Sequence, residues 1–311
     1  MSADIVVSFF QSAIVASVPL VYAAVGEVFN QRSGLMNLGL EGVMLMGAVT
    51  GYMAVVATES LLWSVIIALM AGLVMGLLFG FLVITLKADQ TVCGLAISIF
   101  GTGLSGYIGR TVSGIPAFVT FKPVSIPLLS KIPILGPIFF EQDVLVYAMY
   151  ILVIAAWFYI YKTRQGLVLR SLGESPQTAD ALGINVFRLR YFYTCIGSIL
   201  GALGGAYLTL AYTPLWADKM TSGKGWIALA IVIFATWNPL LVAVGALLFG
   251  GVQVLALRMQ VAGVGIPSQF LNMLPYLLTL IVLILSTGEI GGKKKGNSIK
   301  ALGQPYDRED R

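Results

Sequence analysis

The sequence predicts an all-α fold, a polytopic membrane helix bundle with about nine crossings. Of its 311 residues, 58% are hydrophobic and only 11% are charged, whereas soluble domains carry about 25% charged residues. Several apolar stretches without Asp, Glu, Lys or Arg reach the length of about 20 residues that a helix needs to cross a bilayer. Residues 1–290 are therefore expected to form a transmembrane domain.

The hydrophobic stretches predict the crossings in order, with about 8 to 10 as the range. They are residues 5–25, 38–57, 61–86, 92–112, 144–161, 191–212, 226–237, 239–258 and 271–288. The connection 113–143 contains five prolines, so we expect a folded extracytoplasmic loop rather than one helix. Loop 162–190 is polar, and residues 291–311 are expected to form a tail that is disordered at its end.

Basic residues predict the orientation, because cytoplasmic loops carry an excess of Lys and Arg. With nine crossings, thirteen of the nineteen basic residues fall on the side of loop 162–190 and the tail. The other side holds six, namely Arg110, Lys122, Lys131, Lys219, Lys224 and Arg258. We therefore expect a cytoplasmic C-terminus and an outer N-terminus, whereas a tenth helix or a re-entrant segment would move the N-terminus inside.

A weak internal repeat predicts two inverted halves with broken helices. Ser33-Gly34 follows the first crossing, Ser222-Gly223 follows the sixth, and each pair precedes an interrupted apolar segment and two further crossings. Segment 226–237 would extend only about 18 Å as a helix before Asn238-Pro239, which is too short to span unless the backbone is broken inside the protein. Such breaks at matching positions indicate a substrate path in transporters. Coincidence in a glycine-rich chain is the alternative.

Two spans carry small residues at every fourth position, which places them on one helix face. They are Gly72, Gly76 and Gly80 in one span, and Gly197, Gly201 and Gly205 in the other. This pattern predicts close helix packing, either within the bundle or against a partner subunit.

Four polar or aromatic residues near the breaks are candidates for the substrate pathway: Asn37, Glu41, Trp226 and Asn238. A carboxylate inside the membrane is costly unless it is paired or hydrated, which makes Glu41 a functional candidate. Amides can hydrogen-bond a hydroxyl or base edge, and an indole can stack on a ring. The alternative is structural, with Glu41 paired with Arg32 or backbone amides.

Loop 162–190 contains a second candidate site. Ser175 can cap a helix of about two turns that begins at Pro176, and Gly183 can end it. A short rigid helix of this kind could be gripped by a partner protein. Its candidate contact residues are Gly173, Glu174, Ser175, Ala179, Asp180, Ala181, Leu182 and Gly183.

The chain offers little for catalysis. It has no histidine, its spans hold no paired carboxylates, and Cys93 and Cys195 lie in apolar spans. We expect no metal site. A phosphate-binding Walker A loop is missing, since the nearest run, at 291–298, has no lysine after its last glycine. We therefore expect a non-enzymatic protein with no cofactor of its own.

The runs at 26–47, 173–194 and 222–250 resemble permeases of bacterial ABC importers for simple sugars and nucleosides, relatives of the ribose and branched-chain amino-acid permeases. The resemblance is strongest to the second permease of nucleoside systems that use a basic-membrane-protein-like lipoprotein. It implies a nucleoside or simple-sugar importer in the bacterial cytoplasmic (inner) membrane. In that family the segment matching Gly173 to Gly183 is the coupling helix that docks into the ATPase.

The resemblance also implies the partners. They are a second homologous permease in a heterodimer, a cytoplasmic ABC ATPase that binds ATP and Mg, and an extracytoplasmic substrate-binding protein, with no nucleic acid polymer. An ion-coupled secondary transporter is the alternative from another class. Such carriers usually need membrane-embedded carboxylates, and this chain has little beyond Glu41.

Overall fold

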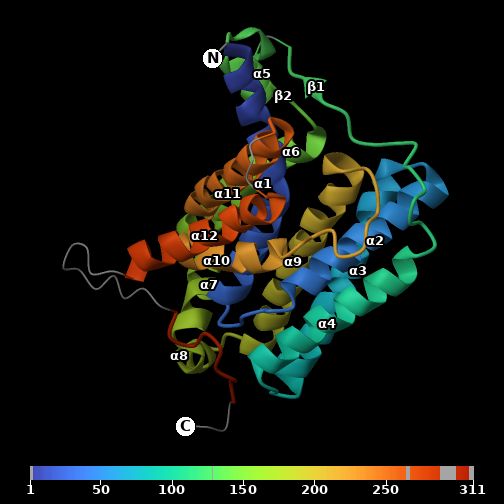
Figure 1. The fold of residues 1–311 in the computed structure, drawn as a ribbon. Helices are drawn as coiled ribbons and strands as arrows, with labels where there is room; N and C mark the ends of the chain where they lie inside the picture. Colours follow the sequence, from blue (N-terminus) through green and yellow to red (C-terminus); the bar gives the residue numbers. More distant parts are fainter. Residues whose placement is uncertain (1–2, 128, 264–266, 288–298, 308–311) are drawn as a thin grey trace.

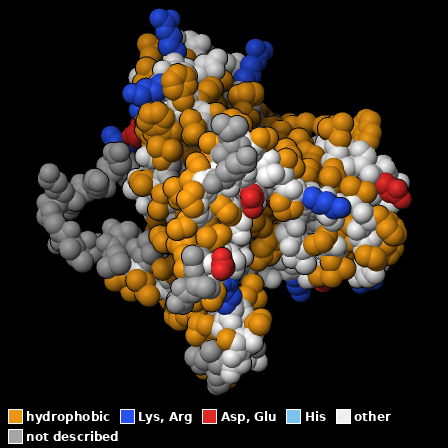
Figure 2. Space-filling view, turned by 90° about the horizontal axis from the view of Figure 1, so that it is seen from above, with side chains coloured by type: hydrophobic (Ala, Val, Ile, Leu, Met, Phe, Trp, Pro, Cys, Tyr) orange, Lys and Arg blue, Asp and Glu red, His pale blue; other side chains and the backbone are white. Residues whose placement is uncertain are grey.

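The computed structural model describes residues 3–127, 129–263, 267–287 and 299–307. They form an elongated helical bundle in which the N-terminus lies at one end and the helix pair 164–181 lies at the other (Figure 1). These are called the N-terminal end and the α8 end. Apolar side chains cover much of the surface seen from above (Figure 2), as expected for helices surrounded by lipid.

The helices of the bundle fall into two sets of four. The first set is α1 (Ala3–Arg32), α2 (Leu40–Thr58), α3 (Leu61–Gly80), continued by the π-helical turn η1 (Phe81–Thr85), and α4 (Gln90–Gly109). The second is α9 (Val186–Tyr207), continued by the π-helical turn η3 (Leu208–Tyr212), α10 (Lys224–Phe234), α11 (Pro239–Val261) and α12 (Ser268–Thr287). α6 (Val144–Lys162), α7 (Arg164–Glu174) and α8 (Pro176–Ala181) connect the two sets.

Seven helices within the described residues are long and apolar enough to cross a membrane. α10 and α12 are two further apolar helices, and they lie at the predicted crossings 226–237 and 271–288. The predicted helix bundle is therefore confirmed. The run 291–298 lies outside the described residues, whereas 299–307 of the tail packs against the bundle.

The first predicted crossing, 5–25, was too short, because α1 continues to Arg32. The sequence pattern ended it before Glu27, a carboxylate in an otherwise apolar region. In the structure Glu27 is buried and accepts hydrogen bonds from Asn30, Gln31 and the Asn37 amide. Buried polar groups are tolerated when they are hydrogen-bonded in this way, so the helix can pass through.

The proline-rich connection 113–143 is folded, as predicted. β1 (Val124–Ser125) pairs antiparallel with β2 (Glu141–Gln142), and η2 (Leu129–Lys131) and α5 (Leu135–Phe140) lie between them. Gln11 of α1 donates a hydrogen bond to the Pro137 carbonyl at 2.9 Å. The connection is thereby attached to the N-terminal end of the bundle.

The two sets of helices pack reciprocally. α1 packs against α9, α10 and α11, while α9 packs against α1, α2 and α3. α1 and α9 run in opposite directions through the centre (Figure 1). Gly34 and Gly223 both have left-handed backbones, with φ of 91° and 81°, at the breaks before α2 and α10. This arrangement supports the predicted inverted repeat.

Both glycine stripes pack inside this chain rather than facing a partner. A Cβ atom at Gly205 would lie 1.8 Å from the Met44 carbonyl oxygen of α2. One at Gly72 would lie 2.6 Å from the Ala202 Cβ of α9. The stripes therefore let α9 approach α2 and α3 closely enough for backbone contact.

Candidate functional site

Glu41 joins the two broken helices. It lies in the first turn of α2, is 8% exposed, and its Oε1 accepts hydrogen bonds from the Thr221 hydroxyl at 2.5 Å and the Gly223 amide at 2.8 Å. Its Oε2 accepts a hydrogen bond from the Gly225 amide at 2.7 Å. The carboxylate thus caps the start of α10 and lies at the N-termini of two helices, where negative charge is stabilised. This arrangement matches the structural alternative for Glu41.

Asn37 shapes the break before α2. Its side-chain Oδ1 accepts a hydrogen bond from the Gly39 backbone amide at 2.9 Å, and the Asn37 backbone amide donates to Glu27 Oε1 at 3.1 Å. Gln31 Nε2 also donates to this oxygen, at 3.0 Å. Sequence reasoning did not select Glu27 as a site residue. The sequence pattern that could have identified it is the polar helix face that Glu27 forms with Asn30 and Gln31, three and four residues later.

The other two pathway candidates lie at opposite ends of α10. Trp226 is 38% exposed. Asn238 caps α11, because its Oδ1 accepts a hydrogen bond from the Leu240 amide at 3.1 Å. The neighbouring Trp237 is buried and donates from Nε1 to Gln31 Oε1 at 2.6 Å. Trp237, which sequence reasoning missed, therefore ties the end of α10 to α1.

An inner cavity of about 640 Å³ lies beside the start of α10. Residues from η3, the break 213–223, α10, α11 and α12 line it. Its polar lining includes Tyr212, Ser222, Lys224, Gln253 and Tyr276. This volume suits a small-molecule ligand, since such pockets commonly measure about 300–1,000 Å³.

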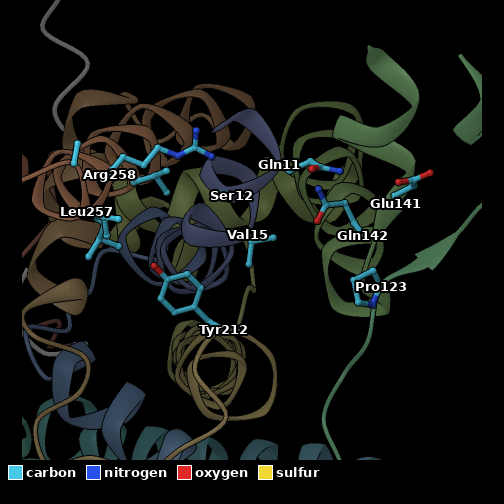
Figure 3. A pocket seen from close by; sticks show the side chains of 12 residues that line it. Gln11, Ser12, Val15, Pro123, Glu141, Gln142, Tyr212, Leu257 and Arg258 are labelled. Atoms are coloured by element: carbon cyan, nitrogen blue, oxygen red, sulfur yellow. The ribbon is translucent and has the colours of Figure 1, made fainter. Parts of the chain in front are cut away.

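An outer cavity of about 700 Å³ lies toward the N-terminal end. Leu257 and Arg258 of α11 lie across it from Pro123 and Glu141, with Tyr212 between them (Figure 3). Tyr212 and Leu257 line both cavities, so the two spaces adjoin. Asn37, Glu41, Trp226 and Asn238 line neither cavity.

Lys224 does not lie in an outer loop, where the distribution of basic residues predicted it. The predicted orientation places it among the basic residues of an outer loop, but it is the first residue of α10 and only 7% exposed. A basic residue directly after a Ser-Gly break and before an apolar segment was the available signal. The chain folds back into the bundle at this break, which brings Lys224 to the inner cavity.

The predicted coupling helix forms as α8 at the far end of the bundle (Figure 1). Ser175 Oγ accepts a hydrogen bond from the Thr178 amide at 3.3 Å, Pro176 is in the first turn, and Gly183 has a φ of 82°. The eight residues predicted to contact the ATPase differ in their exposure to solvent. Glu174, Ala181, Leu182 and Gly183 are exposed, Ser175 and Asp180 are intermediate, and Gly173 and Ala179 are buried.

Leu182 and Ala179 differ most among these residues. Leu182 is 76% exposed at the tip of α8, whereas Ala179 is 1% exposed and faces the bundle. Gly173 is also internal, since a Cβ there would lie 2.6 Å from the Arg32 carbonyl oxygen. The surface that α8 presents therefore centres on Ala181 and Leu182.

Comparison with known proteins identifies the family. Residues 9–286 match the family of branched-chain amino acid transport system permease components. The chain belongs to this family. The permease is 37% identical to the "Guanosine ABC transporter permease protein NupQ" of Bacillus subtilis over 94% of each chain.

Two further relatives are comparably similar. The "Nucleoside ABC transporter permease protein NupC" of Lactococcus lactis is 36% identical, over 93% of the permease and 95% of the relative. The "Putative glucose ABC transporter permease protein TsgC13" of Haloferax volcanii is 35% identical, over 86% and 88%. With its seven long apolar helices in the described region, the permease is a multi-pass membrane protein.

The tail of the permease connects the end of α7 to the first break. The Ala301 amide donates to the Gly173 carbonyl at 2.9 Å, and the Gly303 amide donates to the Gly34 carbonyl at 3.3 Å. Asp307 pairs with Lys87. The buried Tyr306 ring lies 5.5 Å from the Phe187 ring. Residues 299–307 therefore act as a clasp across the α8 end.

Removal of the Tyr306 ring should release this clasp. Truncation of a buried aromatic side chain to alanine costs about 3–5 kcal/mol, which exceeds the roughly 1–3 kcal/mol that the two backbone hydrogen bonds supply together. We expect Tyr306→Ala to increase the rate at which trypsin cleaves the purified permease after Lys300, an exposed residue of the same segment, by tenfold or more. Gln304→Ala, at an exposed position of the same segment, is the control, and equal cleavage rates in both variants would contradict the prediction.

Proposed function

We propose that the permease is the membrane subunit of an ABC importer that carries nucleosides into the cell. The observation that carries this proposal is the near-complete coverage by two relatives whose names specify nucleoside and guanosine transport. A mixed polar and apolar cavity of about 640 Å³ also suits a solute of this size.

The proposal includes a separate ATPase. It binds ATP and Mg, docks on α8 at the cytoplasmic face, and drives transport, while the permease itself hydrolyses nothing. Residues 299–307 would face the same cytoplasmic side, since they pack against Gly173 and Gly34 at the α8 end. The excess of basic residues predicted for this side supports the assignment.

The complex also contains a second permease and an extracytoplasmic substrate-binding protein. Another Bacillus subtilis protein, "Guanosine ABC transporter permease protein NupP", is 24% identical over 85% of the permease. Two related guanosine permease proteins in one organism support a heterodimer of two homologous chains. The binding protein docks at the N-terminal end, where 113–143 is folded against the bundle.

Glucose is the second candidate substrate, because one relative of 35% identity carries a glucose permease name. Reconstitution of the complete importer in liposomes tests both. ATP is supplied on the side of the membrane that carries the ATPase. We expect it to drive transport of guanosine toward that side, and an excess of glucose should not inhibit this transport. ATP-dependent glucose uptake would assign the sugar instead. Uptake by the permease alone in a proton or sodium gradient would establish a secondary transporter and overturn the proposal.

A further inference from the structure

Lys224 is a buried cation at the inner cavity. Its side chain lines this cavity, and no residue that the structure describes accepts a hydrogen bond from it or forms an ion pair with it. Burial of an unpaired charge is costly. An ammonium group in this position therefore needs water or a ligand in the cavity as its acceptor.

Glu41 does not serve as that acceptor. Its two oxygens are occupied by Thr221, Gly223 and Gly225 at 2.5 to 2.8 Å, and it forms no ion pair with Lys224. The carboxylate is thus committed to the helix break, although its charge offsets part of the cost of the nearby cation. The ammonium group of Lys224 carries three hydrogen-bond donors, and water or a ligand in the cavity that this residue lines can accept from them.

The rest of the lining combines apolar surface with several polar groups. Phe249, Ile227 and Pro275 contribute apolar surface, and Gln253 contributes an amide. The Tyr276 hydroxyl is held by a 2.8 Å hydrogen bond to the Ser222 carbonyl, which fixes its ring beside Lys224. Polar groups beside apolar surface suit a small ligand that has both an aromatic part and hydrogen-bonding groups.

We propose that the inner cavity is a transit-binding site for an uncharged nucleoside, in which Lys224 donates hydrogen bonds to oxygens of the ligand. The apolar part of the lining contacts the face of the base. Lys224 is the one cation of this lining, which favours a neutral ligand over a phosphorylated one. This inference rests on the proposed function and assigns its substrate to particular residues.

The position of the cavity fits transit. Tyr212 and Leu257 separate it from the outer cavity and line both spaces. A ligand released at the N-terminal end would pass these two side chains before it reaches Lys224. The site would then hold the ligand beside the break that Glu41 caps, where a movement of α10 could release it.

The first test removes the charge. In the reconstituted importer, Lys224→Met is expected to reduce ATP-driven guanosine uptake tenfold or more, with the amount of assembled complex unchanged. Lys219→Met is the matched control, since this lysine lies in the same connection and is exposed, and its uptake should stay within twofold of wild type. Equal uptake by both variants would overturn the inference.

The second test measures occupancy without transport. Gln253→Cys is placed in the complete importer after Cys93 and Cys195 are replaced by alanine, and labelling by a water-soluble methanethiosulfonate is followed. Guanosine is expected to slow labelling at position 253 severalfold, and Lys224→Met in the same background should abolish this protection. Labelling that guanosine leaves unchanged would overturn the inference even if Lys224→Met assembles poorly.

The two proposals fail in different ways. A wild-type importer that transports glucose but not guanosine refutes the nucleoside function. It also refutes the assignment of a nucleoside as the ligand of Lys224. A wild-type importer that transports guanosine, without protection at position 253 and without an effect of Lys224→Met, refutes only the site.

Discussion

Leu182→Asp is expected to reduce ATP-driven uptake tenfold or more, while the variant still inserts and binds the extracytoplasmic binding protein. Leu182 is 76% exposed at the tip of α8, and burial of such a side chain in a partner groove is worth about 1.5–3 kcal/mol. A carboxylate there loses this contribution and adds a desolvation cost. The measurements are co-purification of the ATPase and uptake in liposomes.

Matched variants separate docking from folding. Leu182→Met conserves volume and apolarity, so assembly and uptake should remain near wild type. Ala181→Cys, which is exposed, should crosslink to the ATPase, whereas Ala179→Cys, at a position 1% exposed, should not react. If Ala181→Cys captures no ATPase in a transport-competent complex, α8 is not the coupling element.

Glu41→Gln is expected to destabilise the permease and to lower uptake about tenfold. An amide cannot reproduce the carboxylate, because its NH₂ group must face either the Gly223 or the Gly225 backbone amide, and both of these are donors. Loss of a charged hydrogen-bond acceptor costs about 1.5–3 kcal/mol. The midpoint temperature of thermal unfolding in detergent should fall accordingly.

Glu59→Gln is the control for this charge change, since Glu59 is exposed at the end of the same helix α2. Its stability and uptake should match those of wild type. A Glu41→Gln permease with unchanged thermal stability would show that the cap on α10 is dispensable. Reduced uptake at unchanged stability would instead assign Glu41 a direct part in transport.

The sequence alone predicted α8, because the residues that cap and end this helix lie within nine positions of one another. Ser175, Pro176 and Gly183 determine the start and end of this helix through backbone geometry alone, and each takes its predicted position. Which side of α8 faces outward depends on how α7, α9 and the tail pack. For that reason Ala179 and Leu182 looked equivalent in the sequence and differ in the structure.

The same division applies to charged residues inside the bundle. Composition showed that Glu41 must find partners, because an isolated carboxylate in an apolar segment is costly. Its partners, at 221–225, are about 180 residues away in the chain. Glu27 and Lys224 were overlooked for a related reason, since hydropathy placed both of them outside the spans.

The sequence by itself determined the helical membrane class, the order of most crossings and the two breaks, since each depends on composition or on neighbouring residues. Tertiary structure decided what the breaks do. Folding brings the starts of α2 and α10 together around Glu41, carries Lys224 to a cavity shared by η3, α11 and α12, and fastens 299–307 to Gly34 and Gly173. These contacts join residues distant in the chain, and the packing of α1 against α9, α10 and α11, together with that of α10 against α2, places them within reach.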